Sequence, residues 1–354
     1  MEGWPGPLYR YRVVTDSPRP ESYREDIESA AHLREGVLPA GRVFQESEAD
    51  KQKLWGDIAA AAESGRDFSS RWFGLTGPLA GKLESTRTSS IVPVDLNAII
   101  CGNLQLMGDL YDAIGDIDGS KWCAQSADLM KQTIHQVAEA HTKNLLKRVL
   151  FRSSGMIALV AGLILTLRTT NISTCSMTPI SSQCIPKPPM LVSNSRPRKS
   201  LPSRNPDFSA FDSECIVNYL RATGVLDFPG GVPSSLVASG QQWDFPNAWA
   251  PTMWILIEGL RMNGQKEIAL EIAEKWVRKN FNMWRASGGK IYEKYNVVSA
   301  CYKIIGGGGE YEMQEGFGWT NGVLLDLLVT YGNQLVWSPA DECQCCVLDC
   351  ICLV

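Results

Sequence analysis

The chain has 354 residues, of which 44% are hydrophobic and 20% are charged, and its formal net charge is −4. This length and this ordinary composition are typical of a globular protein with one large core or two smaller ones. The negative charge argues against nucleic acid as a partner, because a phosphate backbone is bound by a basic surface. The sequence contains no P-loop, dinucleotide fingerprint or zinc-type Cys/His spacing, so it predicts neither a metal nor a cofactor.

The first half of the chain predicts three helices. Residues 1–47 show little periodicity, but hydrophobic spacing from Glu48 predicts a helix that ends at Gly65. Pro93 suits the first turn of a second helix, because its missing N–H would be unpaired there anyway. The side of this helix that we expect to be buried carries Leu96, Ile99, Ile100 and Leu104. A third helix is predicted over residues 121–150, with an apolar stripe made up of Met130, Ile134, Val137, His141 and Leu145.

The middle of the chain and its C-terminus differ in composition from the rest. Residues 155–167 form an apolar run that is shorter than the roughly 20 residues of a membrane span. A buried or monotopic helix is therefore favoured over a membrane span. Residues 169–206 are crowded with Ser, Pro and Arg, which predicts irregular structure. Five cysteines lie in the last twelve residues, where metal binding, lipid attachment and an unrelated tail remain alternatives. The first residues lack the apolar core of a secretory signal, and membrane association stays undecided.

Short helical patterns separated by Gly and Pro loops fill the second half of the chain. They cover residues 215–223, 247–262, 265–278 and 322–331. Few stretches alternate between polar and apolar residues with period two, so we expect strands to be minor. The sequence therefore predicts an all-α protein in which the loops between helix pairs carry the polar residues.

Residues 290–323 concentrate acids, glycines and aromatic side chains. Four consecutive glycines, 306–309, lose backbone entropy in exchange for positive φ angles and close approach by another group. Glu293 precedes these glycines, and Glu310 follows them directly. The combination is typical of the rim of a pocket, and a flexible surface hairpin with solvated acids is the alternative.

Residues 241–251, QQWDFPNAWAP, place two tryptophans and an acid among several amides. Amides and carboxylates form paired hydrogen bonds to neighbouring hydroxyl groups, and indole rings cover the apolar face of a sugar. Trp243 and Asp244 are therefore candidate residues of a carbohydrate-binding pocket. The alternative is a buried turn whose polar groups are satisfied within the protein.

Several stretches of the sequence follow one another in the order of a known family. Residues 242–251 fit the pattern Gln-Trp-Asp, an aromatic residue, Pro and then Trp-Ala-Pro without a mismatch. The other stretches are PRPESY at 18–23, ESGRDFSSRW at 63–72, RTSSIVPVDLNA at 87–98 and the glycine-rich loop at 306–323. Together they resemble the signatures of the trehalase family, glycoside hydrolase family 37. The resemblance covers residues 8–147 and 213–334.

The resemblance implies an all-α fold of the (α/α)6 toroid or barrel type found in glycosidases, incomplete on its N-terminal side. It also implies hydrolysis of the disaccharide α,α-trehalose to two glucose molecules with inversion. Inversion requires two carboxyl groups about 6.5–9.5 Å apart, an acid and a base, with a water between them. By motif position, Asp67 matches the general acid of the family and Glu293 matches its general base. The positions that match sugar-binding residues are Arg19, Glu21, Gly65 and Glu310.

The sequence departs from the family pattern in three ways. The PGGRF-type and RSQPP-type strings of the family, which bring arginine and asparagine contacts to the sugar, do not occur. Residues 153–206 match nothing in the family. Arg66 stands where the family usually has Trp, directly before the predicted acid. A cation beside Asp67 favours its carboxylate form, which opposes the role of an acid.

These features predict a four-part organisation: residues 1–150 and 213–335 as two parts of a trehalase-like catalytic domain, 151–212 as an unrelated insert, and 336–354 as a Cys-rich tail. The expected function is hydrolysis of trehalose, with an activity that truncation could impair. The alternative is a non-catalytic isoform that keeps part of the sugar groove as a binding or regulatory module. Animal members of the family are often secreted or membrane-anchored, so the compartment is left open.

Overall fold

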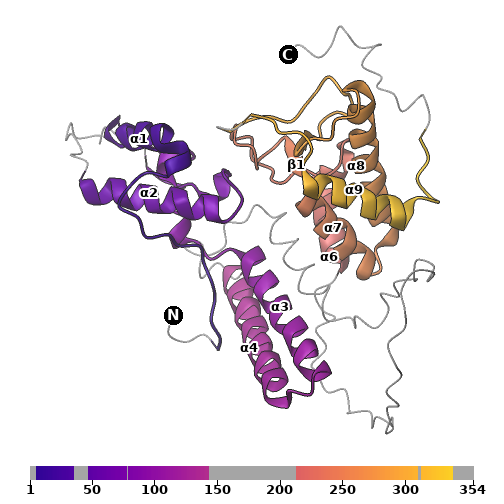
Figure 1. The fold of residues 1–354 in the computed structure, drawn as a ribbon, viewed down its shortest axis with the longest axis horizontal. Helices are drawn as coiled ribbons and strands as arrows, with labels where there is room; N and C mark the ends of the chain where they lie inside the picture. The colour runs from indigo at the N-terminus through magenta and orange to yellow at the C-terminus, as the bar shows by residue number, and fades with distance from the viewer. Residues whose placement is uncertain (1–4, 36–46, 78, 143–212, 310–311, 338–354) are drawn as a thin grey trace, which may run out of the picture.

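The computed structural model describes residues 5–35, 47–77, 79–142, 213–309 and 312–337. Figure 1 shows this part as helices joined by loops, with one short ribbon of two strands. The α-helices are α1 (Tyr23–Ala31), α2 (Glu48–Glu63), α3 (Val94–Ala113), α4 (Ile117–Thr142), α6 (Ser213–Ala222), α7 (Ala250–Met262), α8 (Lys266–Ala286) and α9 (Gly318–Tyr331). The strands are β1 (Asn247–Trp249) and β2 (Lys294–Asn296). The all-α class predicted from the sequence is confirmed.

Helix α2 begins and ends where the sequence predicts. Ser47 accepts a hydrogen bond from the N–H of Asp50, and the Asp50 carboxylate accepts one from the N–H of Ser47, which completes a capping box. Gly65 turns the chain after the helix with a φ of +70°. The core beside α2 consists of Leu54, Ile58, Phe68, Trp72 and other buried apolar residues. The segment that carries Asp67 is therefore anchored before it by aliphatic residues of α2 and after it by the buried rings of Phe68 and Trp72.

Helices α3 and α4 pack against each other as an antiparallel pair (Figure 1). Met130, Ile134 and Val137 of α4 are buried, as predicted. The prediction for α3 was partly wrong, because Ile99 is 42% exposed, whereas Ile100 and Leu104 are partly buried beside Cys101 against α4. Apolar residues surround most of α3, so spacing alone could not select the side that packs on α4. The side chain of His141 and the predicted continuation of α4 lie outside the described residues.

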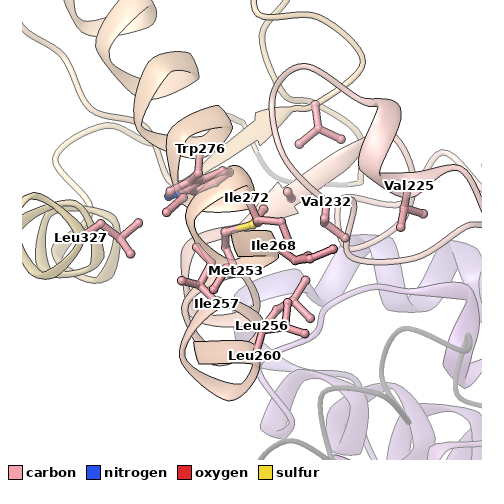
Figure 2. Close-up of a cluster of buried hydrophobic side chains, with 14 of the residues drawn as sticks. Val225, Val232, Met253, Leu256, Ile257, Leu260, Ile268, Ile272, Trp276 and Leu327 are labelled. Atoms are coloured by element: carbon pink, nitrogen blue, oxygen red, sulfur yellow. The ribbon is translucent and has the colours of Figure 1, made fainter. Parts of the chain in front are cut away.

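The core of the C-terminal part lies between α6, α7, α8 and α9. Figure 2 shows Met253 and Ile257 of α7 facing Ile272 and Trp276 of α8, with Leu327 of α9 beside them. The ring of Tyr295 in β2 meets Trp276 edge-on at 5.4 Å, which fixes the ribbon to this core. The helix predicted over residues 247–262 was wrong at its start, because residues 247–249 pair with β2 before α7 begins.

The predicted insert at 151–212, with its apolar run, lies outside the described residues, as does most of the tail at 336–354. Within the described residues, every helix is too short or too polar to cross a lipid bilayer.

Candidate active site

Asp67 lies in the segment between α2 and the 3-10 turn at Ser70–Trp72. Asp67 is half-buried, and the residue after it, Phe68, is 1% exposed. Gly65 is exposed, and its positive φ angle is one that a side chain would disfavour. The chain thus turns sharply after α2, and Asp67 lies at the edge of the core rather than inside it.

Three tryptophans form a cluster beside the Asp67 segment. The rings of Trp243 and Trp249 stack with centroids 4.0 Å apart and planes 2° from parallel. Trp319, at the start of α9, meets both rings edge-on at 6.3 and 5.7 Å and is 37% exposed. The N–H of Trp243 donates to the carbonyl of Phe68 at 3.2 Å, which attaches the cluster to the Asp67 segment. A partly exposed indole surface of this kind suits the apolar face of a sugar.

Asp244 joins the same two loops. Its carboxylate is 0% exposed and accepts hydrogen bonds from the Ser69 hydroxyl at 2.8 Å and from the Ser70 N–H at 2.7 Å. The hydroxyl of Ser235 donates to it at 2.7 Å, and the hydroxyl of Ser239 donates a fourth bond. A carboxylate has about four acceptor sites, so the protein itself occupies them. Asp244 was predicted to bind the sugar, and the structure places it as the link that holds the Asp67 segment.

Glu293 and Asp67 belong to one connected network. Glu293 is 6% exposed, and its Oε1 accepts a hydrogen bond from Lys294 Nζ at 2.6 Å. The same Nζ donates to Oε1 of Gln242 at 2.7 Å. Nε2 of Gln242 in turn donates to the main-chain carbonyl of Asp67. These three hydrogen bonds bring the two predicted catalytic segments together, although they are distant in the sequence.

The glycines at 306–309 pack directly against the loop before β1. The side chain of Asn247 donates to the carbonyl of Gly307 at 2.6 Å and accepts from its N–H at 3.1 Å. The N–H of Gly309 donates to the carbonyl of Gly240 at 3.0 Å. At Gly308, where φ is +91°, an added Cβ would lie 2.5 Å from the carbonyl oxygen of Gly240. Because glycine has no Cβ, residue 308 can lie this close to the main chain of Gly240. Glu310, which follows, lies outside the described residues.

This packing gives a prediction with a matched control. Gly308→Ala is expected to lower the free energy of unfolding by about 1–3 kcal/mol, because a side chain at this φ is strained and meets Gly240. Gly307→Ala is the control, since an added Cβ would meet no atom within 4 Å there. Denaturant unfolding measures both variants. Equal losses in the two would contradict the close approach at Gly308.

Arg19 is fixed beside the Asp67 segment. Its Nε and Nη2 donate to the two oxygens of Asp26 at 3.0 and 2.7 Å, and Arg19 is 5% exposed. Its guanidinium carbon lies 5.1 Å from the centroid of the Phe68 ring. Glu21 occupies the neighbouring turn and is exposed. The structure thus places Arg19 next to the network, whereas Glu21 lies outside it.

Arg66 is turned away from solvent. Its Nη2 lies 3.1 Å from Oδ2 of Asp95, and its guanidinium carbon lies 5.0 Å from the Trp243 ring. Arg71 pairs with the same carboxylate through two hydrogen bonds of 2.9 Å. Burial alone would raise the pKa of Asp95, but the attraction of Arg71 and Arg66 outweighs burial and lowers it. Two cations thus share one carboxylate, and one of them, Arg66, also lies against the Trp243 ring.

Sequence reasoning missed two members of the network, Gln242 and Lys294. A signal was present for each, because Gln242 stands inside the string QQWDFPNAWAP and Lys294 directly follows Glu293. Nothing in the sequence showed that their side chains meet. Among the residues that the structure describes, no three His, Cys, Asp or Glu side chains gather closely enough to hold a metal ion.

Comparison with known families adds to this geometry. The family model described as Trehalase matches residues 5–142 and 203–332. The chain belongs to the trehalase family. The resemblance inferred from its signatures is thereby confirmed, and residues 143–202 lie between the two matched segments.

Individual relatives agree with the trehalase family model. Trehalase from Homo sapiens is 34% identical over 338 residues, which cover 95% of this chain and 49% of the human protein. Trehalase from Tenebrio molitor is 34% identical over 335 residues, which cover 91% of this chain and 50% of the insect protein. The chain spans about half the length of the curated relatives that it matches.

A solved structure shows the same fold. Neutral trehalase Nth1 from Saccharomyces cerevisiae superposes with a TM-score of 0.53 at 15% identity, over 91% of this chain and 52% of the yeast chain. The yeast protein is a glycosidase of the (α/α)6 barrel type, and this trehalase-family chain covers about half of that fold. The predicted fold type is confirmed.

Proposed function

We propose that this chain hydrolyses α,α-trehalose to two glucose molecules, with Asp67 as the general acid and Glu293 as the general base. The observation that carries the proposal is the hydrogen-bonded path through Gln242 and Lys294, which joins the segments of both carboxylates. Relatives that bear the name trehalase match this chain over 91–95% of its length. The tryptophan cluster beside the path offers an apolar surface for a sugar ring.

The proposed mechanism inverts one anomeric carbon. Asp67 gives its proton to the glycosidic oxygen, and Glu293 takes a proton from a water that attacks the anomeric carbon on the opposite face. The bond between that carbon and the glycosidic oxygen breaks as the bond to water forms. One glucose is therefore released as the β anomer, and the other keeps its α configuration. The ammonium of Lys294 lies 2.6 Å from Oε1 of Glu293, so it faces the carboxylate that acts as the base.

We assign the sugar contacts to residues around the two carboxylates. Arg19 offers a guanidinium that Asp26 holds beside Phe68. Trp243 belongs to the indole cluster, in which Trp319 is the partly exposed ring, and the remaining contacts are assigned by motif to Glu21, Gly65 and Glu310. Asp244 acts on the sugar indirectly, by keeping the Asp67 segment in place.

The proposal is tested by incubating the purified chain with α,α-trehalose and measuring glucose release. Proton NMR at early times is expected to show α-glucose and β-glucose appearing in equal amounts, as inversion at one carbon requires. Release of α-glucose alone would contradict the inverting mechanism. Because the chain spans about half the length of its relatives, binding of trehalose is measured separately by calorimetry. Binding without glucose release would overturn the catalytic proposal in favour of a non-catalytic isoform that keeps part of the sugar groove.

Arg66 gives a prediction about rate. Arg66→Trp is expected to raise the turnover of trehalose by on the order of tenfold, because a nearby cation disfavours the protonated acid that Asp67 must supply. Arg66→Met separates the two possible causes, since it removes the charge without adding an aromatic ring. Turnover of the two variants is measured under the same conditions. An unchanged rate in both would refute the inhibitory role of Arg66.

A further inference from the structure

Lys294 has surroundings that are unusual for a lysine. It is 0% exposed, and its Nζ lies within hydrogen-bond distance of Glu293 Oε1 and of Gln242 Oε1. The same nitrogen lies 5.1 Å from the centroid of the Trp249 ring. Lysine is almost never fully buried unless it is paired, and an aromatic face adds further stabilisation of the cation. The Lys294 ammonium thus contacts three residues of the candidate site, which are Glu293, Gln242 and Trp249.

The backbone determines this placement. In the antiparallel ribbon, Lys294 lies opposite Trp249, so the two side chains meet across the strands. The indole N–H of Trp249 donates to the main-chain carbonyl of Gln242 at 2.9 Å. Gln242 is therefore held by its backbone while its side chain bridges Lys294 and the Asp67 carbonyl. The Gln242 side chain therefore fixes the position of Lys294 relative to the main chain of Asp67.

We propose that Lys294 and Gln242 are positioning residues for the hydrolysis, which hold the Glu293 carboxylate at a set place relative to the Asp67 segment. This inference rests on the proposed function. Neither residue needs to touch trehalose: Lys294 acts through Glu293, and Gln242 acts through the main chain of Asp67. Small displacements of catalytic groups are sufficient to alter rates strongly, because the reaction depends on near-attack geometry.

A second buried lysine provides a matched control. Lys279 is also 0% exposed, but its Nζ donates to the main-chain carbonyls of Cys301 and Ile304, each at 2.7 Å. Burial lowers the pKa of Lys279 to about 8. Replacing either lysine removes a buried ammonium and its two hydrogen bonds. The two replacements differ in whether a carboxylate loses its partner.

The kinetic test compares Lys294→Met with Lys279→Met. Lys294→Met is expected to lower kcat about 100-fold, because Glu293 is displaced, while KM changes less than about threefold. Lys279→Met is expected to lose thermal stability but to keep kcat per folded molecule within about threefold of the unchanged chain. Equal kcat values for the two variants would overturn the positioning role, because both would then report stability alone.

Gln242→Met tests whether the two residues act together. If they form one link, the double variant with Lys294→Met is expected to lose no more than about threefold beyond Lys294→Met alone. If the fold-loss in kcat of the double variant equalled the product of the two single losses, the shared link would be overturned. Should Lys294→Met fail to fold, Gln242→Met decides by itself. A kcat at least about tenfold lower supports the bridge, and an unchanged kcat overturns it.

A spectroscopic test separates this inference from the proposed function. The carboxyl resonance of Glu293, labelled with carbon-13 and assigned by comparison with Glu293→Gln, reports the surroundings of the carboxylate without any substrate. It is expected to change its chemical shift in Lys294→Met, where the hydrogen bond from Nζ is lost, and to stay unchanged in Lys279→Met. An unchanged resonance in Lys294→Met would overturn the role of Lys294. Absence of glucose release together with the expected change would contradict the hydrolysis but leave the link between Lys294 and Glu293.

Discussion

Asp67→Asn and Glu293→Gln are each expected to reduce glucose release from trehalose by about 10²–10⁴-fold, the range that one general acid or base contributes. Both changes keep the size of the side chain and remove the group that gives or takes a proton. The Asp67 contact with Gln242 uses the main-chain carbonyl, so Asn at this position leaves it available. The amide oxygen of Gln at 293 can still accept from Lys294. The loss at Asp67 is therefore expected in turnover. Glu293→Gln is expected to lose stability as well, because the buried Lys294 ammonium then has no carboxylate beside it, so its turnover is expressed per folded molecule.

The measurement is initial-rate glucose release, with thermal unfolding of each variant alongside. Glu267→Gln provides the control, because Glu267 is an exposed acid in the first turn of α8 and lies outside the network. It is expected to retain the rate of the unchanged chain. If Asp67→Asn or Glu293→Gln retained that rate as well, the assignment of acid and base would be wrong.

Asp244→Asn is expected to cost about 1–3 kcal/mol of unfolding free energy for each donor left without an acceptor. The Asp244 carboxylate accepts four hydrogen bonds, and an amide presents one oxygen and two N–H donors in its place. The Ser70 N–H and the Ser239 hydroxyl share one carboxylate oxygen, and the hydroxyls of Ser69 and Ser235 share the other. The single amide oxygen can keep one of these pairs, so we expect the donors of the other pair to lose their acceptor.

Denaturant unfolding measures this loss, and amide hydrogen exchange at Ser70 shows whether the Asp67 segment has loosened. Asp326→Asn serves as the comparison, because Asp326 is an exposed carboxylate that accepts one hydrogen bond, from the Trp254 indole at 2.7 Å. A surface change of that kind stays within about ±0.5 kcal/mol. Similar losses at positions 244 and 326 would show that Asp244 is not the link described here.

Local signals in the sequence predicted the helices well, and long-range contacts explain where they failed. The capping residue Ser47 and the turn at Gly65 define α2 within a few neighbouring residues, so the sequence was sufficient. The buried side of α3 depends on where α4 packs, and Ile99 turned out exposed because apolar residues occur on several sides of α3. The strand at 247–249 exists because it pairs with 294–296, a partner that no local pattern reveals.

In the candidate site, too, local sequence signals were informative and long-range contacts were not predictable. Motif strings selected Asp67, Glu293 and Trp243 as candidates, and the structure connects their segments. The strings could not show that Asp244 would be fully occupied by four donors, because three of these come from serines outside the QQWDFPNAWAP stretch and one from a backbone N–H. They could not reveal Lys294 either, since a lysine beside an acid is common and its burial is decided by the fold.

The bonds from Ser69 to Asp244 and from Gln242 to Asp67 each close a loop of 175 residues. Closing a chain of that length costs on the order of 4–5 kcal/mol in entropy, whereas each helix on either side folds through near neighbours. We therefore expect this junction to assemble after the helices on either side of it. A protein weakened at this junction would keep nearly all of its helical signal and yet be inactive, so helix content is a poor guide to competence in this chain.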